Sequence, residues 1–499
     1  MRKFIGLTML PLFLAGCMVG PDYVAPDSEI ANLDLNKENF SRDAGLWKES
    51  TPLDGMPKGD WWSVFNDPQL RWLMEEAKKN NPDLAAAFYA VEQARQNARM
   101  SESELYPWAS GNATYSRTGD SKNLRSYQGT YDKWMVGLGL TWDLDLFGRV
   151  RSLLEAEIAN AQAQLDAYQN VMLILQANVA QTYFTLCQYS SEIELLERTL
   201  AVRKDQSQFV ERRVKFDFSS DLDLQRALQE EYDAAAQLAA VKRQQALAEN
   251  QLAILVGKTP SQLKLKIKPL GDKLPKMPRA VPSQLLERRP DIAAAERAVY
   301  AANARIGAAQ AGFYPTVSIS ANTGLSANKI EKLLDASSFS WGVSPEIYIP
   351  IFQANRIYAQ KQVALAAHKQ TLEQYRSTVL NAIGEVENAL ADIDLLEAEY
   401  ARRSEVTEAS KKVEALTNKQ YDLGYVDYFS VSDAQRQALL NEREQLKLKA
   451  DRFRACVTLV KVLGGGWSLQ DSATFKPESG WYEKTKDMSQ ASEMFESKE

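Results

Sequence analysis

One cysteine stands in a sequence context that favours covalent modification of its thiol. Cys17 ends the tetrapeptide LAGC, which follows Arg2, Lys3 and an apolar run over residues 4–14. A basic start and a short apolar run are the layout of a secretory signal peptide, and the run is too short to span a membrane. The tetrapeptide matches a bacterial lipobox. We therefore predict a signal peptide over residues 1–16 and a covalent lipid on Cys17, with an ordinary signal peptide as the alternative.

The sequence gives little support to enzymatic chemistry. The chain has one histidine, His368, inside a helical pattern. Metalloprotease, serine-hydrolase and phosphate-loop motifs do not occur in the sequence, and neither do paired cysteines. The other two cysteines, Cys187 and Cys456, also lie within helical patterns, which favours two buried thiols and leaves a disulfide open. We predict that the protein is not an enzyme and has no metal site and no cofactor apart from the lipid.

Composition narrows the possible classes of protein further. Charged residues make up 25% of the 499 residues and the net charge is −6, so the chain lacks the basic footprint of a nucleic-acid-binding protein. No apolar stretch reaches the roughly 18 residues that a membrane-spanning helix needs. If the protein crosses a membrane, it must use strands closed into a barrel, because every backbone polar group needs a partner in lipid.

An internal duplication organises the chain. The segment at residues 81–113 recurs without gaps at residues 289–321, so that Pro82 corresponds to Pro290. A period of more than 200 residues indicates a duplicated domain rather than a solenoid. Each copy predicts the same order of elements: a helix, two strands, a long helix and a shorter return helix.

The helical parts predict an elongated bundle. Residues 149–216 contain no glycine or proline, and residues 353–423 contain only Gly384. A continuous helix of that length spans roughly 100 Å, which is typical of coiled coils and helical bundles. We expect two shorter helices to pack antiparallel beside each long one. The shorter helices are expected over residues 82–105, 221–256, 290–311 and 426–463.

Four segments alternate between apolar residues and polar or small residues. They are expected as strands at about residues 107–116, 134–146, 315–325 and 339–351. Alternation over ten or more residues is typical of a transmembrane barrel whose apolar face meets lipid, although a half-buried soluble sheet also shows it. Four strands cannot close a barrel, and an open edge in lipid is very costly. A membrane protein of this kind must therefore pool the strands of several chains.

Six motifs carry a resemblance to a known family. They are CMVGPDY at residues 17–23, GDWWSVFNDPQL at 59–70, DLFGR at 145–149, LLERRPDI at 285–292, FYPT at 313–316 and LGGGW at 463–467. Together and in this order they resemble the outer-membrane factor lipoproteins of the TolC superfamily, in the branch that serves tripartite efflux pumps of the RND type. The resemblance covers about residues 17–467, nearly the whole chain.

The resemblance implies a mainly α fold with a transmembrane β part. In such proteins three chains form a 12-stranded β-barrel on a long α-helical barrel, and an equatorial domain surrounds the helices. Met18, directly after Cys17, favours delivery to the outer membrane. The expected segments are a lipid-anchored N-terminal segment at 17–80, repeat 1 at 81–256, a linker at 257–282, repeat 2 at 283–466 and a polar tail at 467–499.

The resemblance also implies a function and a set of partners. It predicts a homotrimer in the outer membrane of a Gram-negative bacterium, anchored in outer-membrane lipid and extending into the periplasm. This trimer would be the passive exit duct for drugs and toxic solutes, and its partners would be a periplasmic membrane-fusion adaptor and an inner-membrane RND-type transporter. No nucleic-acid partner is expected. The alternatives are the duct of a type I protein-secretion system and a periplasmic coiled-coil scaffold lipoprotein.

The family places its gate at the turns between the long and the return helices. In the first turn, residues 213–227, Asp217 stands where glycine is usual. In the second turn, residues 421–434, Ser430 stands where an aspartate is usual, and Val426 where some members have arginine. Helix capping is the alternative role for the aspartates. The predicted aperture residues are Asp217, Asp221, Asp223, Tyr421, Gly424, Asp427 and Asp433.

Overall fold

The computed structural model describes residues 18–24, 60–119, 121–123, 129–275 and 289–465. The predicted signal peptide, Cys17 and the polar tail at 467–499 lie outside the described residues. Two compact units divide the chain. The first takes its described residues from Met1–Glu29, Tyr89–Leu165 and Ala294–Ser377, and the second from Ile30–Phe88, Asp166–Ala293 and Thr378–Glu499.

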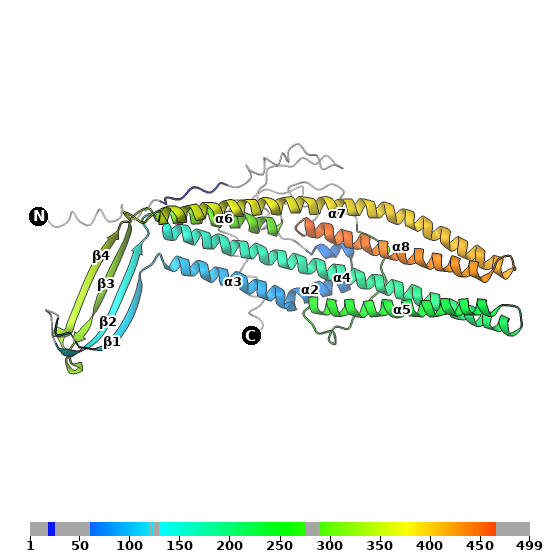
Figure 1. The fold of residues 1–499 in the computed structure, drawn as a ribbon, viewed down its shortest axis with the longest axis horizontal. Helices are drawn as coiled ribbons and strands as arrows, with labels where there is room; N and C mark the ends of the chain where they lie inside the picture. Colours follow the sequence, from blue (N-terminus) through cyan, green and yellow to red (C-terminus); the bar gives the residue numbers. More distant parts are fainter. Residues whose placement is uncertain (1–17, 25–59, 120, 124–128, 276–288, 466–499) are drawn as a thin grey trace. The chain divides into compact units, whose positions relative to one another are not determined.

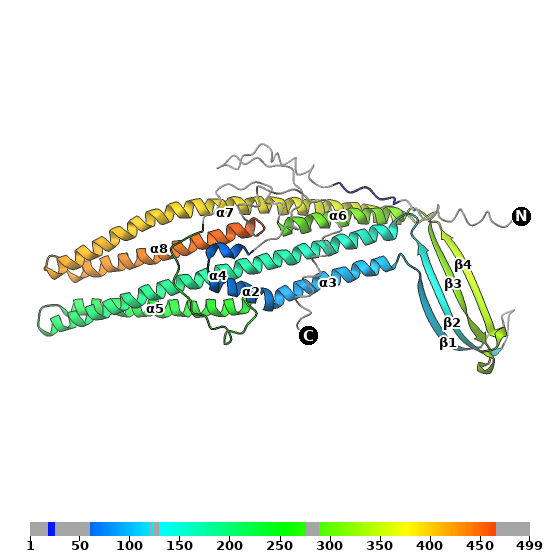
Figure 2. The same ribbon diagram turned by 180° about the vertical axis from the view of Figure 1, so that it is seen from behind.

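Figures 1 and 2 show the helices of the two repeats, and corresponding helices have equal numbers of residues. The two long helices have 67 residues each, the two return helices 35 and the two helices before the strands 22. The mainly helical fold class and the predicted order of elements are confirmed. The helices are α3 (Pro82–Ser103), α4 (Arg149–Lys215), α5 (Asp221–Leu255), α6 (Pro290–Ala311), α7 (Arg356–Asp422) and α8 (Tyr428–Val462).

The four predicted strands form one antiparallel sheet in the order β1-β2-β3-β4. They are β1 (Trp108–Gly119), β2 (Thr130–Leu144), β3 (Thr316–Ala327) and β4 (Phe339–Tyr348), with two 3-10 turns, η5 (Ile330–Lys332) and η6 (Ala336–Ser338), before β4. Within the described residues, β1 and β4 are the edge strands of this sheet.

The register of the sheet brings most apolar residues of the four strands onto one face, with Trp108 and Met135 as exceptions on the other. Directly paired residues of neighbouring strands point to the same side. One row across the sheet contains Ala113, Val136, Leu325 and Phe339. The next row, on the opposite face, contains Asn112, Gly137, Gly324 and Ser340. The predicted alternation therefore extends across the sheet as one mainly apolar face and one face of mainly polar or small residues.

In each repeat, one residue at the start of the helix before the strands bonds to the end of the return helix. These two residues occupy corresponding positions in the repeats. The Asn81 carboxamide donates to the Leu255 carbonyl at 3.0 Å and also caps the first turn of α3. A shift of 208 residues leads from Asn81 to Arg289, whose Nη1 donates to the Val462 carbonyl at 3.0 Å. In both repeats a side chain thus satisfies a carbonyl that the helix end leaves free.

The N-terminal segment adds a 3-10 turn, η3 (Trp61–Phe65), and a helix, α2 (Pro68–Asn80), which the sequence analysis did not predict. Asp67 caps α2 and accepts a hydrogen bond from the Tyr183 hydroxyl at 2.6 Å. The Phe65 ring packs on Phe184 of α4 at 4.9 Å and on Phe453 of α8 at 6.3 Å between centroids. The motif at residues 59–70 therefore attaches this segment to α4 and α8.

The linker packs on the same two helices. The Leu270 amide donates to Ser191 Oγ of α4 at 2.9 Å, and the Leu270 carbonyl accepts from Lys449 Nζ of α8 at 3.1 Å. These contacts fix the described part of the linker across α4 and α8.

The described cysteines are two separate buried thiols, as predicted. Cys187 and Cys456 are both free and buried. Burial raises the pKa of each thiol to about 12, so neither is a reactive thiolate at neutral pH. Within the described residues, no helix combines the length and the apolar character needed to cross a membrane.

Candidate functional site

Each long helix turns into its return helix at a tip, here called tip 1 (residues 213–227) and tip 2 (residues 420–434). Asp217 in tip 1 and Gly424 in tip 2 both have left-handed backbones, with φ of 60° and 80°. The amide after each of them bonds to the carbonyl five residues earlier, at 2.8 and 2.9 Å. This is the Schellman motif that ends many helices. Asp217 therefore performs the same backbone turn that the glycine performs in tip 2.

The return helices begin with the same two residue types in exchanged positions. In tip 1, Ser220 Oγ accepts from the Asp223 amide at 3.2 Å and donates to the Asp223 carboxylate at 2.8 Å. In tip 2, Asp427 accepts from the Ser430 amide at 3.0 Å and from its hydroxyl at 2.7 Å. These hydrogen bonds from Ser430 hold the pKa of the Asp427 carboxyl below its usual value. Asp223 and Asp427 are thus helix-capping residues.

The other predicted carboxylates are also found at the tips. Asp217 and Asp221 are exposed, and Asp221 is the first residue of α5. Asp433 pairs with Arg436 at 3.0 Å on the exposed side of α8. Among the described residues, no three metal-binding side chains come close enough together to hold a metal ion. The predicted aperture residues are therefore distributed over two turns of one chain and do not form a single cluster within it.

An apolar cluster joins the two tips. Val210 and Ala227 of α4 and α5 pack on Tyr428 of α8, which is buried. The ring of Tyr421, another predicted aperture residue, meets Tyr428 edge-on at 5.7 Å. Burial, and then the charge of Glu230, raises the pKa of Tyr428 to about 12. The cluster stabilises the packing of α4 and α5 against α7 and α8 next to the turns.

Two arginines of tip 1 lie over aromatic rings of tip 2. The Arg213 guanidinium is 5.6 Å from the centroid of Tyr421 and 5.8 Å from that of Phe209 on its own helix. The Arg226 guanidinium is 5.2 Å from the centroid of Phe429. Both distances across the tips fall within the range of cation–π interactions.

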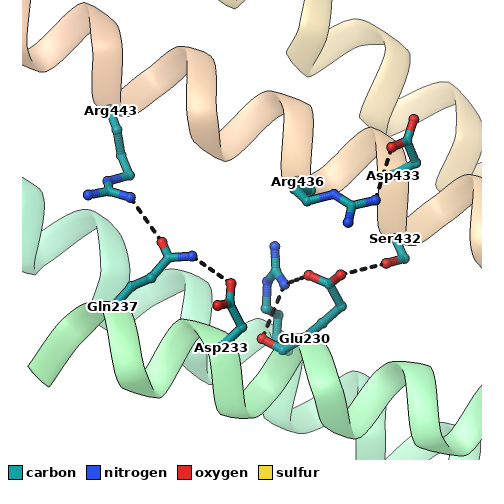
Figure 3. A network of polar contacts seen from close by, with 8 residues as sticks. Glu230, Asp233, Gln237, Ser432, Asp433, Arg436 and Arg443 are labelled. Carbon is teal, nitrogen blue, oxygen red and sulfur yellow. Dashed lines mark hydrogen bonds and ion pairs between the residues drawn. The ribbon is translucent and has the colours of Figure 1, made fainter. Parts of the chain in front are cut away.

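A buried polar network lies behind the tips (Figure 3). Arg203 of α4 forms an ion pair with Glu230 of α5, and both side chains are buried. The second carboxylate oxygen of Glu230 accepts from Ser432 Oγ of α8 at 2.9 Å. Further along the helices, Arg443 of α8 donates to Gln237 of α5 at 3.1 Å. Buried charges need partners of this kind, and these partners come from three helices.

Sequence reasoning did not find Arg203, Glu230, Arg213 or Arg226. Their positions fit ordinary helical patterns, and helical periodicity does not tell which face of one hairpin meets the other hairpin. The only sequence indication was the concentration of arginine on the tip 1 side and of aromatic residues on the tip 2 side.

The residues after Cys17 form a segment along α6, although Cys17 itself lies outside the described residues. The residue directly after Cys17 packs on Gly148, where any side chain would collide with it. Gly20 and Gly307 approach so closely that a Cβ on Gly20 would lie 2.8 Å from the Gly307 Cα. The Tyr23 ring packs on a tyrosine of α6 at 4.7 Å. This segment therefore has a fixed place beside α6 and the turn that follows β2.

The fold defines a class of protein. In the part of the chain that the structure describes, a sheet with one mainly apolar face and two edge strands occurs with long helical hairpins in two repeats, which is the architecture of an outer-membrane channel subunit. A family model described as outer membrane efflux protein matches residues 73–258 and again residues 281–465. The chain belongs to this family, and the double match corresponds to the internal duplication.

Characterised relatives resemble the chain over nearly its whole length. The solvent efflux pump outer membrane protein SrpC of Pseudomonas putida is 33% identical over 94% of this chain and 100% of its own. The cation efflux system protein CusC of Escherichia coli is 32% identical over 91% of this chain and 97% of its own. The solved structure of the outer-membrane channel OprN has a TM-score of 0.80 and 27% identity, and covers 90% of this chain and 100% of that one.

These comparisons confirm four predictions: the family, the fold class, the location in the outer membrane and the function as an efflux channel protein. The lipid on Cys17 and the aperture residues stay predictions.

Proposed function

We propose that three copies of this chain form the outer-membrane exit duct of a tripartite efflux pump. The observation that carries the proposal is the four-stranded sheet, with its mainly apolar face and its two edge strands. Such edges need partners in lipid, and three sheets joined edge to edge supply a closed barrel of twelve strands. The similarity to the OprN channel over 90% of the chain supports the same arrangement.

The duct works with a periplasmic membrane-fusion adaptor and an inner-membrane RND-type transporter. The names of its relatives assign them to solvent, cation and antibiotic efflux pumps. We propose that toxic small solutes cross this duct passively and that the chain catalyses no reaction. The single histidine, the buried thiols and the family of channels support that reading.

The lipid on Cys17 gives the duct a second attachment to the membrane. Stable anchoring takes more than one acyl chain, and the segment after Cys17 would hold the anchor beside α6 and the end of β2. Mass spectrometry of the mature N-terminal peptide should show acylation of Cys17. A mature protein that begins at another residue would exclude the anchor.

The two tips form the periplasmic gate of the duct. In a trimer, three copies would place about fifteen tip carboxylates around one axis, and rings of negative charge favour cations. These carboxylates repel one another, so the gate must be held closed by other contacts. Docking of the adaptor would stabilise the open arrangement.

The gate can be tested without destroying the helix caps. Asp223→Asn with Asp433→Asn removes two charges per chain, and an asparagine at position 223 can still accept the capping-box hydrogen bond from Ser220. In planar bilayers the purified trimer should lose part of its cation selectivity. Asp205→Asn, an exposed aspartate of α4 outside the tips, is the matched control and should leave selectivity as in the wild type. Equal selectivity of both variants and the wild type would show that Asp223 and Asp433 do not set the selectivity of the gate.

A further inference from the structure

Two guanidinium groups connect the hairpins directly at the tips. Arg213 and Arg226 come from α4 and α5, and the rings beneath them, Tyr421 and Phe429, come from α7 and α8. All cross-tip cation–π contacts in the described part of the chain thus have the cation on tip 1 and the ring on tip 2. This arrangement is separate from the aspartates considered so far.

The surroundings of Arg213 indicate that the rings hold its side chain. Its guanidinium lies 5.8 Å from the ring centroid of Phe209 and 5.6 Å from that of Tyr421. Its one described hydrogen bond, from Nη2 to the Phe218 carbonyl, is long at 3.4 Å. Its Nε is buried and has no hydrogen-bond partner among the described residues. A buried donor without a partner is costly, so the position of Arg213 needs another source of stabilisation, and the two rings provide it.

Arg226 contacts tip 2 in two ways. Its guanidinium is 5.2 Å from the Phe429 ring centroid, and its charge is one of the causes that lower the pKa of the Asp427 carboxyl, after the hydrogen bonds from Ser430. Phe429 is half exposed at 51%, so burial of the ring alone gives little stabilisation. The cation above it supplies an attraction that depends on tip 2 staying beside tip 1.

The contacts behind the tips keep these pairs aligned. The apolar cluster of Val210, Ala227 and Tyr428 lies between the two hairpins, and the buried Glu230 carboxylate accepts from Ser432 across them. Loosening at the turns would therefore break the arginine–ring pairs first, since they are more exposed than this packed region.

We propose that Arg213 and Arg226 are positioning residues that hold the gate closed by clamping the rings of Tyr421 and Phe429. The proposal rests on the proposed function and deepens it. Guanidinium groups keep their charge at all physiological pH values and are weakly hydrated, so this clamp persists while the tip carboxylates repel one another. Opening then requires tip 2 to slide its rings out from beneath the arginines of tip 1.

Single-channel recording of the purified full-length trimer tests the clamp. Arg213→Gln and Arg226→Gln remove the cation but keep a polar side chain. Each should raise the ratio of open to closed time by roughly two- to five-fold per chain, or about ten- to a hundred-fold if the three tips open together. Arg212→Gln is the matched control, because Arg212 is the exposed neighbour of Arg213 and its loss changes the charge of the tip equally. It should stay close to the wild type.

The ring partner distinguishes a clamp from a general loss of packing. Tyr421→Phe keeps the ring and removes the hydroxyl, whereas Tyr421→Leu removes the ring. The clamp predicts that the leucine variant opens far more than the phenylalanine variant. It also predicts that Arg213→Gln has little further effect in the leucine background, since the two changes remove one interaction. Lysine at position 213 should restore part of the closure, because an ammonium group also binds a ring.

The outcomes distinguish a failure of the proposed clamp from a failure of the proposed duct function. If the wild type conducts and Arg213→Gln behaves as Arg212→Gln, with trimers intact, the proposed clamp is wrong and the proposed channel function is unaffected. Additive effects of Arg213→Gln and Tyr421→Leu would also overturn the clamp. If the wild-type trimer does not conduct at all, the proposed duct itself fails.

Discussion

Tip 1 and tip 2 correspond through a shift of 207 residues, and they reach the same backbone geometry with different side chains. Asp217 corresponds to Gly424, and both adopt the left-handed conformation. Ser220 caps α5, whereas Asp427 caps α8. The turn and the cap are therefore properties of the position, and more than one residue type can supply them.

The two tips differ in the side chains with which they contact each other. A duplicated unit that packs against its own copy no longer needs identical surfaces, because the two copies now meet as different partners. Tip 1 supplies the guanidinium groups of Arg213 and Arg226, and tip 2 supplies the rings of Tyr421 and Phe429. The two repeats have thus kept their lengths and turns while their contacting side chains became complementary.

The two repeats also differ in the residue that joins the pre-strand helix to the return helix, which is Asn81 in repeat 1 and Arg289 in repeat 2. Substitution of Arg289 is expected to change stability most. Arg289 holds the end of α8 and also bonds to Asp291 and Glu385 at 2.6 and 2.7 Å. Burial alone would lower the pKa of Arg289, but its bonds to Asp291 and Glu385 raise it overall. Arg289→Ala should cost roughly 2–3 kcal/mol of local stability, because it leaves charged acceptors without their donor.

The corresponding change in repeat 1 should cost less. Asn81→Ala removes uncharged hydrogen bonds and should cost about 1 kcal/mol. Hydrogen exchange of the last turns of α8 and α5 measures both losses. Arg402→Ala, which breaks an exposed ion pair with Glu405, is the control and should cost less than about 0.5 kcal/mol. Equal losses at Arg289 and Asn81 would show that the charged junction adds nothing.

An exchange of residues between the tips should have a smaller effect. Asp217→Gly removes a side chain from a left-handed position and should stabilise tip 1 by about 0.5–1 kcal/mol. Gly424→Asp should destabilise tip 2 by a similar amount, although the space around Gly424 is open. Exchange rates of the amides at each turn give both values. A loss of protection in Asp217→Gly would mean that the aspartate side chain itself stabilises tip 1.

The sequence predicted those parts of the fold that depend on local pattern. The absence of glycine and proline defined α4, and period-two alternation defined β2 and β4, each within a few residues of its ends. Because of the internal repeat, each element predicted in one copy was also expected in the other. Asp217 was recognised as standing at a glycine position from the family resemblance, and the corresponding residue in the second repeat, Gly424, is a glycine.

The rest depended on contacts between distant segments. The pairing of Glu230 with Ser432 joins residues about two hundred positions apart, and no periodicity reveals it. Helix α2 is short, with 13 residues of which four are buried, and its N-cap Asp67 bonds to Tyr183, more than a hundred positions away. Whether an aspartate caps a helix or faces a pore depends on which residue begins that helix. The first residue of a helix is less certain than the existence of the helix.

The smallest predicted effect concerns the two caps and pH. Hydrogen bonds from Ser430 lower the pKa of Asp427 in the folded protein. A group with a depressed pKa stabilises the folded state above its unfolded pKa, about 3.9 for aspartate, and loses that contribution as pH falls through the lower folded value. The first turn of α8 should therefore exchange faster below about pH 4, relative to intrinsic rates. Asp427→Asn keeps a neutral cap and should show no such loosening, while Ser430→Ala should move it to higher pH. If the wild type and Asp427→Asn loosen equally in acid, the Asp427 carboxylate does not stabilise the start of α8.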